Sequence, residues 1–261
     1  KAGNVALVTN DINLGDWDSS YDLFCTLNLG GCTLLSNDRF LNRMEDVASL
    51  INGTIQIGST VDAAIASENY GLIEGVNVEP TDNSSALATV AGAVIDNHGT
   101  ITRCNASLKV SGTTALYVGG IAATSLSTAS HSAIIDDCTV TNRVSGGTYG
   151  GGIVGQANGY VTGNTFEYGI TLLQDKTTHK NIVGAKETSH ELHAENNAWP
   201  TVDEDLDLTN LTEVENRYSG IIDSESELLA STGVSYNLSS KRYRLAQDIT
   251  VSSQVGDVAY E

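Results

Sequence analysis

A repeating pattern of small and apolar residues, with a period of about 28 residues, is the strongest constraint on how this chain folds. A pair of small residues is followed, seven residues after its second member, by a glycine. This occurs at Ala63-Ala64 with Gly71, Ala91-Gly92 with Gly99, and Gly151-Gly152 with Gly159. A fourth pair, Gly119-Gly120, opens a copy that carries about six inserted residues around positions 125–130. The second members of the four pairs lie 28, 28 and 32 residues apart, so we predict stacked structural repeats.

Apolar positions that follow each small pair also align from repeat to repeat. The three columns are Ile73, Ile101, Ile135, Val161; then Val76, Cys104, Cys138, Asn164; then Val78, Ala106, Val140, Phe166. Apolar residues two apart lie on one face of a β-strand. Short strands separated by Gly and Asn turns therefore predict an all-β solenoid, a parallel β-helix with coils of about 23–32 residues. A β-sandwich is the alternative, although it does not need columns with constant internal offsets.

Several residues in these columns are candidates for structural roles. The tripeptides that end at Gly71 and Gly99 are predicted turns, as is Gly159, because Asn and Gly tolerate a left-handed backbone. Cys104 and Cys138 share one inward column, which favours two buried thiols packed as small hydrophobic groups. A disulfide is the alternative, and it needs a geometry that stacked parallel strands do not readily offer. We expect the inward amide of Asn164 to hydrogen-bond to the backbone.

The repeats resemble a known family of sequence motifs. Residues 151–161 resemble the GLUG-type repeat of bacterial cell-surface proteins, and residues 118–122 and 97–101 are weaker copies. Residues 4–14 and 24–34 resemble the strands that often precede such repeats, although Cys25 and Thr26 depart from the expected glycine. The resemblance covers residues 4–199. It implies a right-handed parallel β-helix in a secreted or surface-anchored, modular, adhesin-like protein without a shared catalytic set.

The chain divides into three parts. We predict that residues 1–200 form the β-helix and that 201–220, which carry the densest run of acids, form a linker or peripheral segment. Residues 243–251 align with 6–14, so 221–261 are expected to begin a further module of a longer array, unless the likeness is coincidental. A capping-box pattern of Ser and Glu predicts a short capping helix near 224–230.

Composition excludes several classes of protein. The chain has 13 Lys and Arg against 32 Asp and Glu, a net charge of −19, which disfavours nucleic acid as a partner. Hydrophobic residues make up 40% of it, too many for a disordered acidic polymer. Apolar runs stay well below the ~18 residues of a membrane-spanning helix. The four cysteines lack a CxxC spacing, so neither a zinc site nor a disulfide scaffold is expected.

A catalytic site has weak candidates only. Parallel β-helices host polysaccharide lyases and glycoside hydrolases, which need converging carboxylates, or a base with cations. The columns place Arg103 beside Asp137 on neighbouring repeats, with Asp136 next to them. The simpler interpretation is an exposed ion-pair ladder worth at most about 1 kcal/mol. We therefore expect no enzyme activity, with a polysaccharide-degrading enzyme as the alternative.

Metal-ligating patterns are weak as well. Asp203, Asp205 and Asp207 resemble the start of a calcium loop, but the glycine and the final acid of an EF-hand are missing. We therefore expect no metal and no cofactor, with adventitious calcium as the exception. His190 and His193 flank Glu191 with a spacing that suits a helix, whereas a strand or turn is predicted there.

The expected function is that of a non-catalytic module, either adhesive or a structural stalk, on a bacterial cell surface or in a secreted protein. A host surface or a carbohydrate is the expected partner. Ice binding is a third option, since flat β-helix faces with rows of threonine can order water. The pairs Thr100 and Thr102, and Thr139 and Thr141, fall in different columns, so a regular lattice of threonines is not expected.

Overall fold

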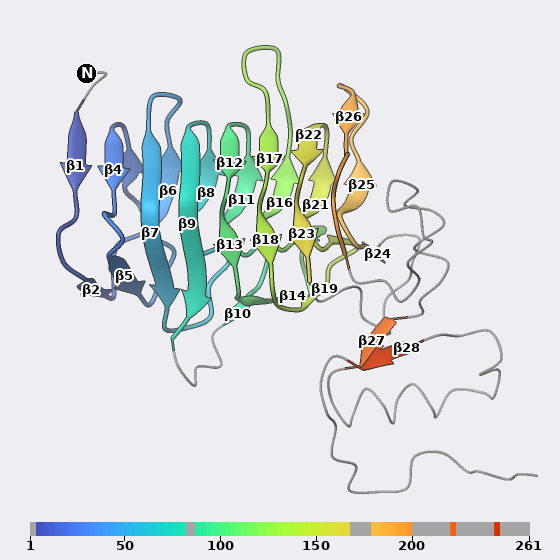
Figure 1. Ribbon diagram of the computed structural model, residues 1–261, viewed down its shortest axis with the longest axis horizontal. Coiled ribbons are helices and arrows are strands. Elements are labelled where there is room, and N and C mark those ends of the chain that lie inside the picture. The colour runs from blue at the N-terminus through green and yellow to red at the C-terminus, as the bar shows by residue number, and fades with distance from the viewer. Residues whose placement is uncertain (1–3, 82–86, 168–178, 200–219, 223–242, 246–261) are drawn as a thin grey trace, which may run out of the picture.

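The chain folds into β-strands that pair in parallel along the length of the molecule (Figure 1). This computed structural model describes residues 4–81, 87–167, 179–199, 220–222 and 243–245. Within those ranges there are strands and turns, and no residue lies in a helix. The arrangement is all-β with long parallel sheets, compatible with the predicted parallel β-helix or solenoid.

Five sheets contain the strands of the described ranges. The largest, called the long sheet, has 13 strands: β1 (Val5–Leu7), β2 (Ile12–Gly15), β4 (Thr26–Asn28), β5 (Thr33–Ser36), β7 (Ser49–Ile57), β9 (Leu72–Pro80), β12 (Thr100–Thr102), β13 (Asn105–Ala106), β17 (Ile134–Asp136), β18 (Thr139–Val140), β22 (Gly159–Thr162), β23 (Thr165–Phe166) and β26 (Leu192–His193). A seven-stranded second sheet contains β3 (Asp22–Leu23), β6 (Leu41–Met44), β8 (Ala66–Asn69), β11 (Val94–Asn97), β16 (Ala122–Ser125), β21 (Val154–Ala157) and β25 (Val183–Lys186).

Three smaller sheets complete the described strands. One contains β10 (Leu87–Ala88), β14 (Lys109–Gly112) and β19 (Val144–Gly146), and another contains β15 (Tyr117–Gly119), β20 (Tyr149–Gly151) and β24 (His179–Lys180). The last pairs β27 (Gly220–Ile222) with β28 (Tyr243–Leu245). The predicted helix near 224–230 and residues 201–219 of the predicted linker lie outside the described residues. Gly220, the last residue of that linker, begins β27.

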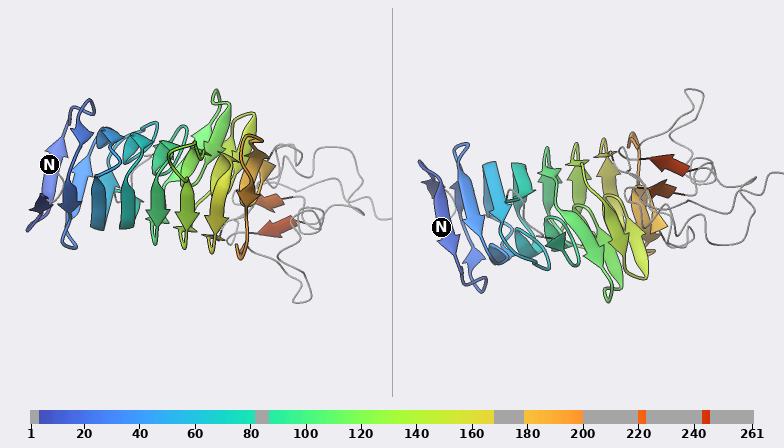
Figure 2. Two further views of the ribbon diagram at one scale, coloured as in Figure 1. Left: turned by 90° about the horizontal axis from the view of Figure 1, so that it is seen from above. Right: turned by 90° about the horizontal axis from the view of Figure 1, so that it is seen from below.

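The register of the strands confirms the columns predicted from the repeat. Ile73, Ile101, Ile135 and Val161 are direct partners on successive strands, and Leu50 extends this column by one repeat. Val78, Ala106, Val140 and Phe166 are likewise direct partners. All of these side chains are buried in one continuous hydrophobic core. Figure 2 shows that successive repeats follow one another along the long axis, so each repeat packs mainly on its two neighbours.

The second residue of each small pair lies against the backbone of the next repeat. A Cβ atom at Gly92 would overlap the carbonyl oxygen of Gly120, and one at Gly120 would overlap that of Gly152. At Gly152 a Cβ atom would overlap both the carbonyl of Asn181 and the ring of Phe166. Close approach between neighbouring repeats therefore explains why small residues recur at this position.

The glycines at the ends of two of the three predicted turns have a different role from the one expected. Gly71 and Gly99 do not adopt a left-handed backbone, so that part of the prediction was wrong. Their hydrogen atoms instead face the carbonyls of Ala48 and Gly71 in the preceding repeat, which a Cβ atom would overlap. Gly159 does adopt a left-handed conformation, with φ of 81°.

The left-handed turn of each repeat lies elsewhere, directly after the first strand segment of the long sheet. Six successive repeats place one residue there with φ between 51° and 67°: Asn52, Gly75, Arg103, Asp137, Gly163 and Asn196. Asn and Asp tolerate this conformation better than other side chains, whereas Arg is unusual there. This shared turn sets the positions of Arg103 and Asp137 on the surface.

A buried ladder of polar side chains joins three repeats of the second sheet. Asn69 donates from Nδ2 to Oδ1 of Asn97 over 2.8 Å, and Asn97 donates from Nδ2 to Oγ of Ser125 over 3.0 Å. Both asparagines also bond to the backbone of the glycines that follow them, Asn69 to the Gly71 N–H and Asn97 to the Gly99 carbonyl. All three side chains are fully buried, so the ladder satisfies groups that water cannot reach.

We expect Asn97→Ala to lower the free energy of unfolding by about 2–3 kcal/mol, because it leaves the buried partners Asn69 and Ser125 without their bonds. Urea denaturation measures this change. The matched control is Asn77→Ala on the long sheet, where the asparagine is half-buried and makes no side-chain hydrogen bond within the described residues. Its expected cost is below about 1 kcal/mol. Equal losses in the two variants would contradict a structural role for the ladder.

Candidate functional site

The three catalytic candidates lie on two neighbouring repeats, Arg103 on one and Asp136 and Asp137 on the next. Arg103 and Asp137 occupy the left-handed turn and are exposed, while Asp136 is half-buried at the end of β17. The backbone N–H of Arg103 donates to the carbonyl of Asp136 over 3.1 Å, so the turns of the two repeats are in contact. The predicted proximity is therefore present in the backbone.

The side chains of two of these candidates, Arg103 and Asp136, are paired with other residues. Arg103 forms its ion pair with Glu74 on the preceding repeat, rather than with Asp137 on the following one. The carboxylate of Asp136 accepts a 2.6 Å hydrogen bond from the hydroxyl of Thr162. Since Arg103 is 58% exposed, its pair with Glu74 is a surface ion pair of small energetic value. The arrangement holds the charges of Arg103 and Glu74 together on the surface.

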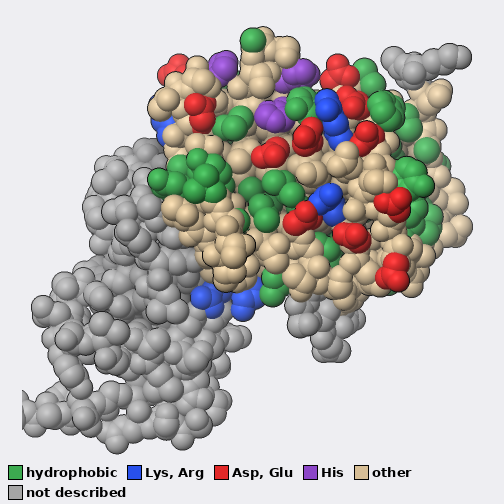
Figure 3. All heavy atoms as spheres, turned by 180° about the vertical axis from the view of Figure 1, so that it is seen from behind, with side chains coloured by type: hydrophobic (Ala, Val, Ile, Leu, Met, Phe, Trp, Pro, Cys, Tyr) green, Lys and Arg blue, Asp and Glu red, His purple; other side chains and the backbone are tan. Residues whose placement is uncertain are grey.

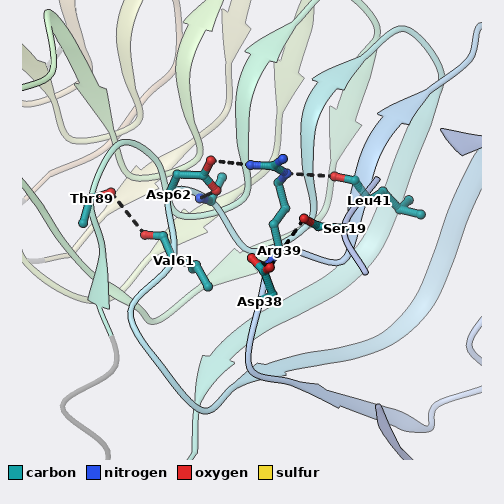
Figure 4. A network of polar contacts seen from close by, with 8 residues as sticks. Ser19, Asp38, Arg39, Leu41, Val61, Asp62 and Thr89 are labelled. Atoms are coloured by element: carbon teal, nitrogen blue, oxygen red, sulfur yellow. Dashed lines mark hydrogen bonds and ion pairs between the residues drawn. The ribbon is translucent and has the colours of Figure 1, made fainter. Parts of the chain in front are cut away.

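A network of charged residues that is more deeply buried than the Arg103 pair lies at the bend between the long sheet and the second sheet (Figure 4). The guanidinium of Arg39 pairs with the carboxylate of Asp62 on the next repeat and donates from Nε to the Leu41 carbonyl over 2.9 Å. The backbone N–H of Arg39 donates to Asp38, whose carboxylate also accepts a 3.5 Å bond from Ser19. Asp62 in turn accepts a 2.7 Å bond from the N–H of Ala63, the first residue of a small pair. The network therefore fixes where that pair begins.

Aromatic and histidine side chains form a further cluster, at the edge that follows the second sheet. The ring of Tyr70 lies between the guanidinium of Arg43, 4.3 Å from the ring centroid, and the imidazole of His98, which stacks at 4.8 Å. His131 approaches the same ring edge-on at 5.4 Å. His98 also donates from Nδ1 to the carbonyl of Leu126 over 2.8 Å. These contacts hold the inserted loop predicted around residues 125–130, which projects between β16 and β17 (Figure 1).

The predicted pair of His190 and His193 lies in a bend and a strand, as expected, and not on a helix. His193 is in β26 and stacks on Tyr160 at 4.8 Å, with its Nε2 atom 3.7 Å from Glu191. His190 is exposed and contacts Ser189. Among the residues that the structure describes, no three His, Cys, Asp or Glu side chains are grouped as metal ligands would be. The calcium candidates Asp203, Asp205 and Asp207 lie outside the described residues.

Cys104 and Cys138 are buried, stacked on neighbouring repeats, and present as free thiols. Each thiol donates to the carbonyl two residues before it, over 3.3 Å. The hydrogen bond with Cys104 and burial raise the pKa of Cys138 well above its usual value. At the next position of the column, Asn164 donates to the Ile135 carbonyl over 3.0 Å and accepts from the Cys138 N–H over 2.9 Å. The expectation that Asn164 bonds to the backbone is confirmed.

Charged side chains are also spread over the face opposite to the view of Figure 1. Figure 3 shows the face opposite to the view of Figure 1, where acidic and basic side chains are interspersed among uncharged ones. Arg43 in β6 is paired with Glu45 at 3.1 Å and with Glu68 at 3.6 Å. The described residues include no helix that is long and apolar enough to cross a membrane.

Compared with protein-family models, with curated proteins and with solved structures, the chain matches none of them. The GLUG-type resemblance therefore rests on the residues of the repeat alone.

Two arginines of different burial provide a test of which charged groups stabilise the stack of repeats. We expect Arg39→Ala to lower the free energy of unfolding by about 1–2 kcal/mol, because the side chain is only 15% exposed and its loss removes the bonds to the Leu41 carbonyl and to Asp62, which is itself 38% exposed. Arg103→Ala should lower the free energy of unfolding by less than about 1 kcal/mol, and this loss should be smaller still at high salt. Urea denaturation of both variants checks the order. A larger loss for Arg103→Ala would show that the exposed pair carries an unrecognised role.

The two buried thiols should resist alkylation in the folded protein. At pH 8 without reductant, iodoacetamide should leave Cys104 and Cys138 unmodified, because burial excludes the reagent and the raised pKa of Cys138 keeps that thiol protonated. In denaturant, mass spectrometry should find both residues alkylated. If both stay unmodified in denaturant until a reductant is added, the two cysteines form a disulfide.

Proposed function

We propose that this chain is a non-catalytic, right-handed parallel β-helix module of the GLUG type. It acts in adhesion or as a structural stalk, in a secreted protein or on a bacterial cell surface. The handedness and the family come from the resemblance of residues 4–199 to GLUG-type repeats. The parallel register of successive repeats is consistent with that resemblance.

The pairing of the candidate side chains is the observation that carries the non-catalytic part of the proposal. The cation of Arg103 is paired with Glu74, and Asp136 is engaged by Thr162. Asp137 is exposed at the turn and has no side-chain partner within the described residues. The side chains of Arg103 and Asp136 thus link neighbouring repeats to one another, which suits a structural role. The proposed module needs no cofactor.

A longer array of modules is part of the same proposal. Strand β28 begins at Tyr243, which aligns with Ala6 inside β1, so the aligned segments 243–251 and 6–14 both start with a strand in a parallel pair. This agrees with residues 221–261 beginning a second module. A parent sequence in which the pattern of residues 4–199 recurs after position 243 would support it, and one without such a recurrence would contradict it.

Enzyme activity on polysaccharides is the outcome that would overturn the proposal. We expect the protein to release no reducing ends and no unsaturated sugars from a panel of neutral and acidic polysaccharides over many hours. The matched variant is Asp137→Ala, which removes the exposed carboxylate and should change nothing. Turnover by the wild-type protein that Asp137→Ala abolishes would establish a glycan-degrading enzyme instead.

A further inference from the structure

One outward column of the long sheet consists only of short, uncharged side chains that can form hydrogen bonds. It runs through six successive repeats in direct register, as Thr33, Thr54, Asn77, Asn105, Thr139 and Thr165. We call it the Thr/Asn column. Strands in a sheet lie ~4.8 Å apart, so the column offers one polar group at that interval along the long axis of the molecule. Asn77 and Asn105 interrupt the threonines, which is why the sequence did not reveal it.

The protein leaves the polar groups of this column unused. Within the described residues none of the six side chains makes a hydrogen bond. The Oδ1 atom of Asn105 is buried, so a ligand could reach only the other polar atoms of the column. The neighbouring outward column differs, because Glu74 pairs with Arg103 and Asp136 binds Thr162. Unused donors and acceptors at a constant interval suit a ligand that repeats at a similar interval.

Charge restricts the class of that ligand. One flank carries Glu74, Asp136 and Asp137 together with Arg103, which is paired with Glu74, and the other flank carries Glu79 and Glu167. The Thr/Asn column itself has no charge. Acidic side chains on the flanks repel polyanions, and the Thr/Asn column has no basic side chain that could bind the negative charges of such a ligand. An uncharged polymer with hydroxyl groups can donate to and accept from Thr and Asn along its whole length.

We propose that the Thr/Asn column binds an extended, uncharged, β-linked polysaccharide whose chain lies along the long axis and crosses the strands. This inference rests on the proposed function, since it names the ligand class of an adhesive module. The residues of such a glycan repeat at an interval close to that of the strands, so several sugars contact several repeats at once. Weak contacts at each repeat then add up along the column.

The test measures depletion of the protein by amorphous cellulose, an insoluble β-1,4-glucan, and its salt dependence. The variant Thr33→Val/Thr54→Val/Thr139→Val removes three hydroxyls and keeps the β-branched shape that strands favour. We expect the wild-type protein to bind and the variant to bind about tenfold more weakly or worse. The control Thr26→Val/Thr100→Val/Thr102→Val alters the same sheet in other outward columns and should bind within about twofold of the wild type.

Thermal denaturation of all three proteins verifies that each is folded. No binding of the wild-type protein to the glucan, or equal loss in the test and control variants, would overturn the inference. Inhibition of ice growth that needs the Thr/Asn column, without glucan binding, would assign the column to ordered water instead. These outcomes leave the proposed function intact, because only the release of sugars, measured on the same samples, would contradict a non-catalytic module.

Discussion

Direct stacking of equivalent residues on neighbouring repeats is the constraint on which the rest of this structure depends. Each inward residue lies on its partner in the next repeat, as Ile101 lies between Ile73 and Ile135. Because residues in the core are closely packed, a large side chain in one column requires a small residue in the column that it faces. Gly92 faces Ala106, Gly120 faces Val140, and Gly152 faces Phe166, whose ring would overlap any Cβ atom there. The small pairs therefore follow from packing as much as from backbone geometry.

The same constraint decides where polar residues are tolerated inside. An amide in a stacked column is satisfied only if its neighbours above and below supply partners. Asn97 meets this condition between Asn69 and Ser125, and Asn164 meets it through Asn197, to whose Oδ1 atom it donates over 3.1 Å. The column of Asn164 holds the thiols of Cys104 and Cys138 in the two preceding repeats, where only weak donors are needed. Inward polar groups thus occur as connected ladders, as buried hydrogen bonding requires.

The repeat predicted the fold far better than it predicted the surface. Columns of apolar residues are visible in the sequence because burial limits the choice of side chain, and the register confirms them. The left-handed turn was hidden because its residue changes from repeat to repeat: Arg103 and Asp137 stand where the other repeats have glycine or asparagine. The sequence also did not predict that Arg103 pairs with Glu74, because the repeats before and after Arg103 both place an acidic residue near it. The pair of Arg39 and Asp62 lies outside the repeated columns, although an acid directly before a small pair was a signal that could have been used.

Residues in an outward column have the same spacing from repeat to repeat as those of the core, whether or not the column has a function of its own. What distinguishes them is how their polar groups are used. Where Glu74 and Arg103 or Asp136 and Thr162 bind each other, the column contributes to holding the repeats together and presents little to a ligand. In the Thr/Asn column the groups are uncharged and unpaired within the described residues, so, apart from the buried Oδ1 atom of Asn105, they are free to bond to the surroundings. A periodic protein surface of this kind discriminates between ligands by their period and charge rather than by the shape of one pocket, and this favours polymers over small molecules.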